Sequence, residues 1–171
     1  MLSARLAKFG LEVSQEKSRL IEFGKGAYWR SKRRGSRLNT FDFLGFTHYV
    51  TRSRRGCVRL GRKTIGKRMS RALTDLNNKL RQLRNAMPFR ALYEHLGRRL
   101  KGYYNYYGFA GNSVTLRKFH HAVRKMWFKW LNRRSQRKSF NWQEFKAFLV
   151  YFSLPEPRIF KGYAWIHSAS K

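Results

Sequence analysis

The sequence predicts an α+β fold, with an N-terminal helix, short strands and a β-hairpin followed by a mainly α-helical bundle. β-type residues form short runs before residue 64, whereas apolar residues recur at three- and four-residue steps from Thr64 onward. Of the 171 residues, 42% are apolar and 16% are aromatic, which is enough for a hydrophobic core. We therefore expect one domain or a pair of small subdomains.

The first 39 residues predict a helix, a strand and a loop. The first ten residues have apolar side chains on one helical face and end at Gly10, which suits a helix C-terminus. The run SRLIEF, residues 18–23, predicts a short strand. Residues 24–39 are rich in Gly, Arg and Lys without either period, so they predict a cationic loop.

A hairpin is predicted over residues 40–64. Two β-rich runs flank a turn at Arg54, Arg55 and Gly56. The turn is not the tight Asn-Gly type, so the sequence leaves the register open.

Two long amphipathic helices follow the hairpin. The first begins near Thr64 and covers about twenty residues. Pro88 suits the first turn of the second, which Gly108 and Gly111 end. The apolar stripe of the first helix contains Ile65, Met69, Leu73, Leu76, Leu80 and Leu83.

A third long helix and a short fourth one complete the predicted bundle. Asn112 or Ser113 can cap the third helix. The short helix begins near Asn141 and ends before the segment LPEPRIF, because Pro155 and Pro157 cannot continue a helical hydrogen-bond ladder. Three consecutive amphipathic helices indicate a helical bundle.

The charge of the chain predicts a polyanionic partner. Its 39 Lys and Arg against 8 Asp and Glu give a formal net charge of +31, which opposes compaction until an anion neutralises it. No uninterrupted apolar run approaches about 18 residues, and the N-terminus lacks a signal-peptide core. We therefore expect a soluble cytoplasmic protein, bacterial or organellar. Because Cys57 is the single cysteine, we expect no disulfide framework within the chain.

Catalytic and metal-binding patterns are not evident. The two aspartates, Asp42 and Asp75, and six glutamates are scattered, whereas two-metal phosphoryl transfer needs several convergent carboxylates. His120 and His121 are adjacent and point in different directions on a helix. We expect no catalytic residue, no metal ligand and no cofactor bound by this chain alone.

The stretch RRLKGYYNYYGFAGN, residues 98–112, is better suited to binding RNA. Lys and Arg can contact phosphates, and exposed aromatic rings can stack on unpaired bases. Four tyrosines span more than one turn, so two are expected to pack between helices while at least one can stack on RNA. The candidate RNA-binding residues are Arg98, Arg99, Lys101, Tyr103, Tyr104, Tyr106, Tyr107, Lys118, Arg124, Lys125, Arg133, Arg134, Arg137 and Lys138.

Five motifs can be recognised together along nearly the whole chain. In chain order they are RLAKFGLEVSQEKSRLIEFG (5–24), FDFLGF (41–46), LKGYYNYYGFAGN (100–112), FHHAVRKMWFKWLNRRSQ (119–136) and LPEPRI (154–159). In their order and approximate spacing they resemble the C-terminal part of group II intron-encoded reverse transcriptase/maturases.

The resemblance implies three parts of the chain. Residues 1–62 look like the end of a reverse-transcriptase palm with a primer-grip-like hairpin, residues 63–134 like the helical thumb or domain X, and residues 135–171 like a maturase-specific C-terminal region. The palm-end lysine is Lys17, and the primer-grip-like residues are Phe43, Leu44, Gly45 and Phe46. The tyrosine-rich segment would join two thumb helices.

The resemblance also implies what the chain would not do alone. The family's Tyr-Ala-Asp-Asp strand lies upstream of the matching segment, so we expect no polymerase activity from this chain, and Mg²⁺ only in a complete reverse transcriptase. The expected function is an RNA-binding maturase fragment that stabilises folded group II intron RNA and assists splicing. Two alternatives remain: the thumb-side half of a split RNA-directed DNA polymerase that needs a partner chain, and a basic ribonucleoprotein component with no intron role.

Overall fold

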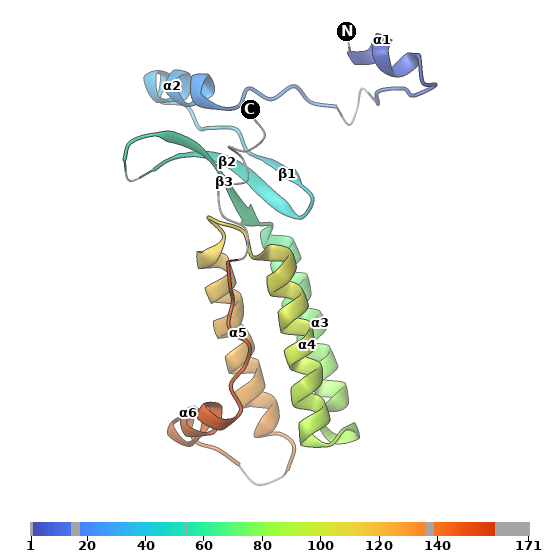
Figure 1. Ribbon diagram of the computed structural model, residues 1–171, viewed down its shortest axis with the longest axis vertical. Helices are drawn as coiled ribbons and strands as arrows, with labels where there is room; N and C mark the ends of the chain where they lie inside the picture. Colours follow the sequence, from blue (N-terminus) through green and yellow to red (C-terminus); the bar gives the residue numbers. More distant parts are fainter. Residues whose placement is uncertain (1, 15–17, 54, 136–138, 160–171) are drawn as a thin grey trace. The chain divides into compact units, whose positions relative to one another are not determined.

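The computed structural model confirms the α+β fold: a three-stranded antiparallel sheet precedes a mainly helical region (Figure 1). The chain forms two compact units, one of residues 1–40 with 49–60 and one of residues 41–48 with 61–171. The residues that the structure describes are 2–14, 18–53, 55–135 and 139–159.

In the first unit, α1 (Leu2–Ala7) confirms the predicted N-terminal helix, and Gly10 follows it with a positive φ of 67°. The predicted strand over residues 18–23 is wrong, because this segment is neither helix nor strand. A strand needs a hydrogen-bonded neighbour, and the described sheet contains only β1, β2 and β3. A β-type composition alone therefore did not make a strand.

The loop predicted over residues 24–39 is also wrong, because α2 (Lys25–Arg34) lies within it. Arg and Lys are good helix formers, and cations in a last turn are favoured by the helix dipole. Arg30 of α2 forms an ion pair with Glu22. Gly35 ends the helix in the left-handed conformation, with φ 63°.

The sheet contains β1 (Phe41–Phe43), β2 (Phe46–Arg52) and β3 (Val58–Thr64) in the order β1-β2-β3. The predicted hairpin is β2 and β3; the amide of Ser53 donates to the carbonyl of Cys57 at 2.8 Å beside the turn. β1 pairs with β2 as a further antiparallel strand.

The turn between β1 and β2 places two consecutive residues at positive φ, Leu44 at 47° and Gly45 at 81°. Two-residue hairpin turns of type I′ require this conformation at both positions. A branched side chain such as leucine rarely adopts it, so other contacts must hold the turn.

All four predicted helices of the second unit are confirmed: α3 (Gly66–Ala86), α4 (Phe89–Tyr107), α5 (Ser113–Leu131) and α6 (Trp142–Tyr151). α3, α4 and α5 lie side by side, and α6 lies near the C-terminal end of α5 (Figure 1). Asn141 begins α6 with a capping box: its side-chain oxygen accepts from the amides of Gln143 and Glu144, and Glu144 accepts from the Asn141 amide.

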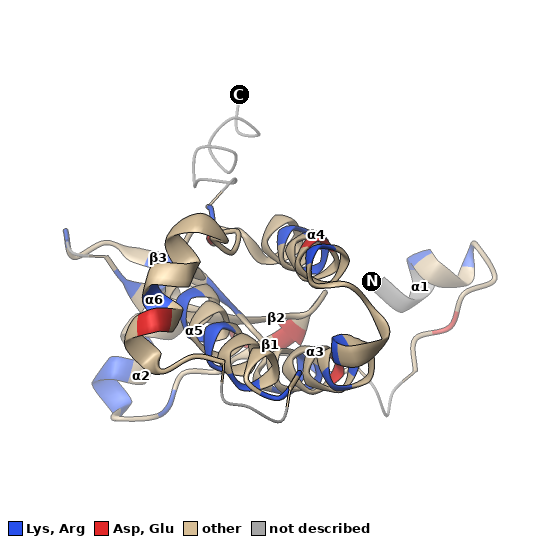
Figure 2. Cartoon of the chain, turned by 90° about the horizontal axis from the view of Figure 1, so that it is seen from below, with Lys and Arg blue, Asp and Glu red and all other residues tan. Residues whose placement is uncertain are grey.

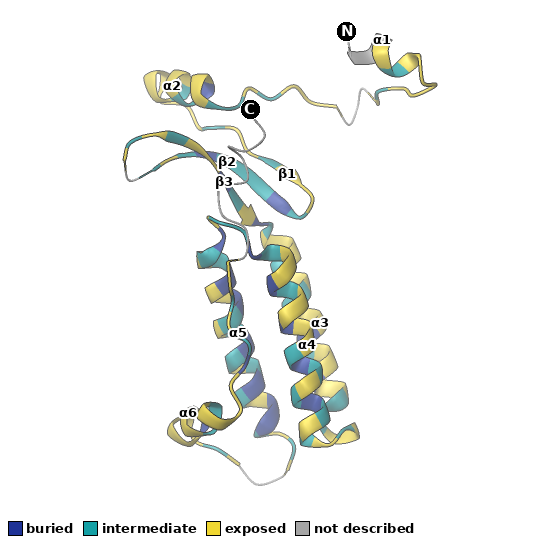
Figure 3. Cartoon of the chain, in the orientation of Figure 1, coloured by how far each residue is buried: buried dark blue, intermediate teal, exposed yellow. Residues whose placement is uncertain are grey.

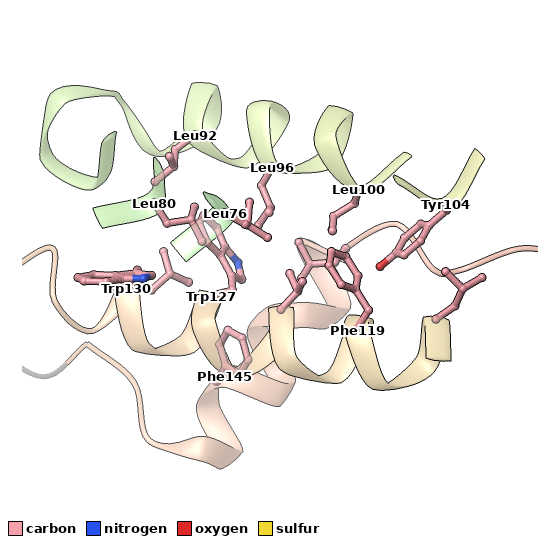
Figure 4. Packing of buried hydrophobic residues seen from close by; sticks show 14 residues of the cluster. Leu76, Leu80, Leu92, Leu96, Leu100, Tyr104, Phe119, Trp127, Trp130 and Phe145 are labelled. Carbon is pink, nitrogen blue, oxygen red and sulfur yellow. The ribbon is translucent and has the colours of Figure 1, made fainter. Parts of the chain in front are cut away.

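A continuous hydrophobic core joins these helices. Their inward faces are buried and their outward faces are exposed (Figure 3), and leucines of α3 and α4 pack on aromatic residues of α5 (Figure 4). Phe145 of α6 and Leu154 after it complete the cluster. Its buried members are Leu76, Leu80, Leu92, Leu96, Leu100, Tyr104, Leu116, Phe119, Val123, Trp127, Trp130, Leu131, Phe145 and Leu154.

Asn112 precedes α5 as predicted, but its side chain does not cap the helix. Instead, the amide of Thr64 donates to Asn112 Oδ1 at 3.0 Å, and Asn112 Nδ2 donates to Thr64 Oγ1 at 2.8 Å and to the carbonyl of Tyr107 at 2.9 Å. Asn112 is fully buried and Thr64 is 4% exposed. One side chain thus joins the end of β3 to the connection between α4 and α5.

We expect Asn112→Ala to lower the free energy of unfolding by about 2 to 4 kcal/mol, because it leaves buried groups of Thr64 without their hydrogen-bond partner. Denaturant titration followed by circular dichroism measures this. Asn78→Ala, at an exposed position of α3, is the matched control and should change stability by less than about 0.5 kcal/mol. Equal effects of the two substitutions would contradict the role assigned to Asn112.

Candidate nucleic-acid interface

The four tyrosines at the end of α4 have different environments. Tyr104 is buried, Tyr103 and Tyr107 are half-buried, and Tyr106 is 52% exposed. The ring of Tyr103 stacks on Phe119 of α5 at a centroid distance of 3.8 Å. The prediction that two tyrosines pack between helices is confirmed by Tyr103 and Tyr104. Tyr106 is the most exposed of the four.

Tyr104 and His120 form a polar pair between α4 and α5. The Tyr104 hydroxyl and His120 Nδ1 are hydrogen-bonded at 2.9 Å. Burial raises the pKa of Tyr104, so the phenol keeps its proton. Burial, assisted by the positive charge of Arg124, lowers the pKa of His120 and outweighs the opposing effect of Glu156. The folded protein therefore favours a neutral imidazole.

Tyr106 and Tyr107 contact the turn between β1 and β2, which contains the residues predicted to be primer-grip-like. The Tyr106 hydroxyl donates to the carbonyl of Leu44 at 2.9 Å. A Cβ atom at Gly45 would lie 3.3 Å from the Tyr107 hydroxyl, so a larger residue there would crowd that side chain. These contacts explain how Leu44 keeps its positive φ.

The hairpin residues divide into buried and exposed positions. Phe46 is 7% exposed and contacts the rings of Tyr106, Tyr107 and Phe109 at centroid distances of 6.0, 5.3 and 5.2 Å. Phe43 and Leu44 are 58% and 68% exposed. The hairpin thus presents an apolar tip, while Phe46 anchors it.

The predicted cations of α4 are exposed, and two of them line a surface depression. Arg98, Arg99 and Lys101 all face solvent. Arg98 and Lys101 line the depression beside Gly97, on which Pro155 packs. The carboxylate of Glu94 belongs to the same depression, so its lining carries both signs of charge.

Two of the three predicted cations of α5 share one side of the helix. Lys118 and Lys125 are exposed and seven residues apart, so they share one side of the helix. Arg124 is half-buried beside His120. Lys and Arg recur along α3, α4 and α5, where Asp and Glu are few (Figure 2).

The two arginines after α5 differ. Arg133 is exposed, with its guanidinium carbon 5.7 Å from the ring centroid of Trp130. Arg134 donates to the carbonyl of Met87 at 3.1 Å, so it joins the ends of α3 and α5. The predictions for Lys17, Arg137 and Lys138 concern positions outside the described residues.

Two cations of this surface were not among the residues predicted from the sequence. Arg84 and Lys129 join Arg133 around Trp130. The spacing of Lys129 and Arg133 at the end of a helix could have indicated their shared face, but nothing in the sequence pairs them with Arg84.

Among the described residues, no three His, Cys, Asp or Glu side chains are placed to hold a metal ion. The described helices include none with the length and apolar character needed to span a membrane.

Comparison with known families identifies the helical bundle. Residues 65–148 match the group II intron, maturase-specific domain. The chain contains a maturase-specific domain. This domain covers α3, α4, α5 and most of α6 and implies group II intron RNA as a partner, in agreement with the resemblance seen in the sequence. Comparisons with curated proteins and with solved structures gave no match.

The match extends past residue 134, the expected end of the thumb part, as far as residue 148 in α6. The three-part division expected from the resemblance stays a prediction. The same holds for the RNA-binding roles of individual residues.

We expect the maturase-specific domain to lose stability as the pH falls below about 6.5, in part through His120. Its pKa is lowered in the folded state, so the unfolded chain binds the proton more readily and the free energy of unfolding falls with pH. Thermal melts between pH 7.5 and 5.5 measure this. His120→Gln should weaken the pH dependence, whereas His121→Gln, at the exposed neighbouring position, should leave it unchanged. Identical pH profiles for the two variants would contradict the assignment.

Proposed function

We propose that this chain binds folded group II intron RNA through the cationic outer faces of its helical bundle and stabilises an RNA fold that is competent for splicing, without a covalent step of its own. The observation that carries the proposal is the maturase-specific domain at residues 65–148. The bundle that forms this domain is also rich in exposed cations.

The arrangement of the helices supports binding to a folded RNA. A rigid core holds α3, α4 and α5 side by side, so their cations keep fixed separations. Fixed cations favour a phosphate backbone with matching spacing, whereas a flexible basic segment would accept any RNA. Exposed candidates lie on α4 and on α5, so a folded RNA can contact both.

Electrostatics alone would give affinity without selectivity. If about ten cations contact phosphates, the association constant should fall by about seven to nine powers of ten for each tenfold rise in salt concentration. Selectivity for the intron must then come from shape and from exposed groups such as Tyr106 and the hairpin tip at Phe43 and Leu44.

We expect the chain to prefer a folded group II intron RNA over an unrelated structured RNA of equal length by about tenfold or more, which is about 1.4 kcal/mol. Filter binding or fluorescence anisotropy across a salt series measures both affinities. The preference should persist while salt weakens both complexes. Coinciding curves would contradict the proposal and favour a basic protein that binds any RNA.

A second candidate function is the thumb-side half of a split RNA-directed DNA polymerase. It is supported by the primer-grip-like hairpin, because residues 41–48 belong to the same compact unit as the helical bundle. Tyr106 fixes the hairpin turn through Leu44, which would keep a primer-gripping tip in register with the thumb.

This second function predicts a stable complex with a partner chain that carries the Asp-Asp strand. Tagged protein purified from its native host, with nuclease treatment to remove RNA-bridged partners, should then retain such a chain, and the complex should extend a primer on an RNA template. Recovery of intron RNA without any such partner would support the first function alone.

A further inference from the structure

Three cationic side chains from two helices converge on one tryptophan. Arg84 extends from the last turn of α3, and its guanidinium carbon lies 5.0 Å from the ring centroid of Trp130. Lys129 in the last turn of α5 and Arg133, two residues beyond the end of that helix, place their charged groups 4.8 and 5.7 Å from the same centroid. We call these three residues and Trp130 the Trp130 cluster.

The indole is a fixed platform. Trp130 is 4% exposed and its Nε1 donates to Asn77 Oδ1 of α3 at 3.0 Å. It closes one end of the core, opposite Tyr104 (Figure 4). Arg134 adds a second link, because it donates to the carbonyl of Met87 beyond the end of α3. The cations that touch the indole are therefore held on a rigid frame.

The positive charge of the cluster is not neutralised by the described part of the protein. None of the three cations forms an ion pair with a described carboxylate; the pairs found there are Glu22–Arg30 and Arg90–Glu94. The ring quadrupole and the C-terminal ends of two helix dipoles partly offset the repulsion. Lys129 and Arg133 remain exposed and Arg84 half-exposed, so their N–H donors can reach a ligand.

We propose that the Trp130 cluster is a binding site for a phosphodiester group of RNA. The site rests on the proposed RNA-binding function and assigns a specific anion position to it. Two guanidinium groups can each donate two parallel hydrogen bonds to phosphate oxygens, and the lysine adds a point charge. Because Trp130 is buried, it orients the cations and cannot itself stack on a base.

The first test compares two triple variants that remove the same charge. Arg84→Gln/Lys129→Gln/Arg133→Gln should bind the intron RNA about tenfold more weakly than Lys67→Gln/Arg71→Gln/Arg117→Gln, whose three positions are exposed elsewhere on α3 and α5. The cluster variant should also lower the salt slope by about one. Equal affinities of the two triple variants would overturn the site.

A conservative variant separates geometry from charge. Arg84→Lys/Arg133→Lys keeps the net charge and removes the planar donors, so we expect about threefold or more loss of affinity. Unchanged binding would mean that the cluster contributes only general positive potential. Thermal melts of each variant establish that it is folded.

Chemical modification tests the site in the unmodified sequence. RNA should protect Lys129 from an amine-reactive reagent more strongly than it protects Lys146, an exposed lysine of α6, as measured by mass spectrometry. Equal protection would contradict the proposal. The two proposals can fail separately. If the wild-type protein shows no preference for the intron but any RNA still protects Lys129, the proposed function is overturned and this site remains.

Discussion

The structure of the larger unit depends on the buried hydrogen bonds between Asn112 and Thr64. The side-chain oxygen of Asn112 accepts a hydrogen bond from the amide of Thr64. Its side-chain nitrogen donates to Thr64 Oγ1 and to the carbonyl of Tyr107. The two residues are 48 positions apart, so the contact fixes the end of β3 against the connection between α4 and α5. These hydrogen bonds favour one arrangement of the two segments. A shift of either segment would leave polar groups without partners in a low-dielectric interior.

That constraint explains why the tyrosine-rich segment lies where it does. With the last turn of α4 fixed next to β3, Tyr106 can reach the carbonyl of Leu44, and Phe46 can insert among Tyr106, Tyr107 and Phe109. Most of the crowded aromatic surface therefore stabilises the protein. The surface available for RNA is mainly cationic, with Tyr106 and the hairpin tip as its exposed apolar groups.

The sequence predicted the helices from Thr64 onward because their apolar stripes are long and periodic, and capping or proline signals mark their ends. The prediction was wrong for α2, because its cationic, glycine-containing composition suggested a loop although Arg and Lys are good helix formers. It was also wrong for residues 18–23, because these β-type residues have no strand partner in the described sheet. The candidate site was predictable as a set of cations and tyrosines. Its geometry was not, because the Asn112–Thr64 bonds and the approach of Arg84 to Trp130 join residues that are distant in sequence.

The charge distribution links folding to binding. A net charge of +31 destabilises any compact form through self-repulsion, so the chain needs a large aromatic core and cations placed where helix dipoles and indole rings attract them. A phosphate backbone that binds the folded form more tightly than the unfolded chain offsets that repulsion in the folded state. RNA binding must then also stabilise the fold by mass action. On the proposed function, the same cations that limit the stability of the free protein would supply the affinity for RNA, while the core that includes Trp127 and Trp130 holds together the helices that carry them.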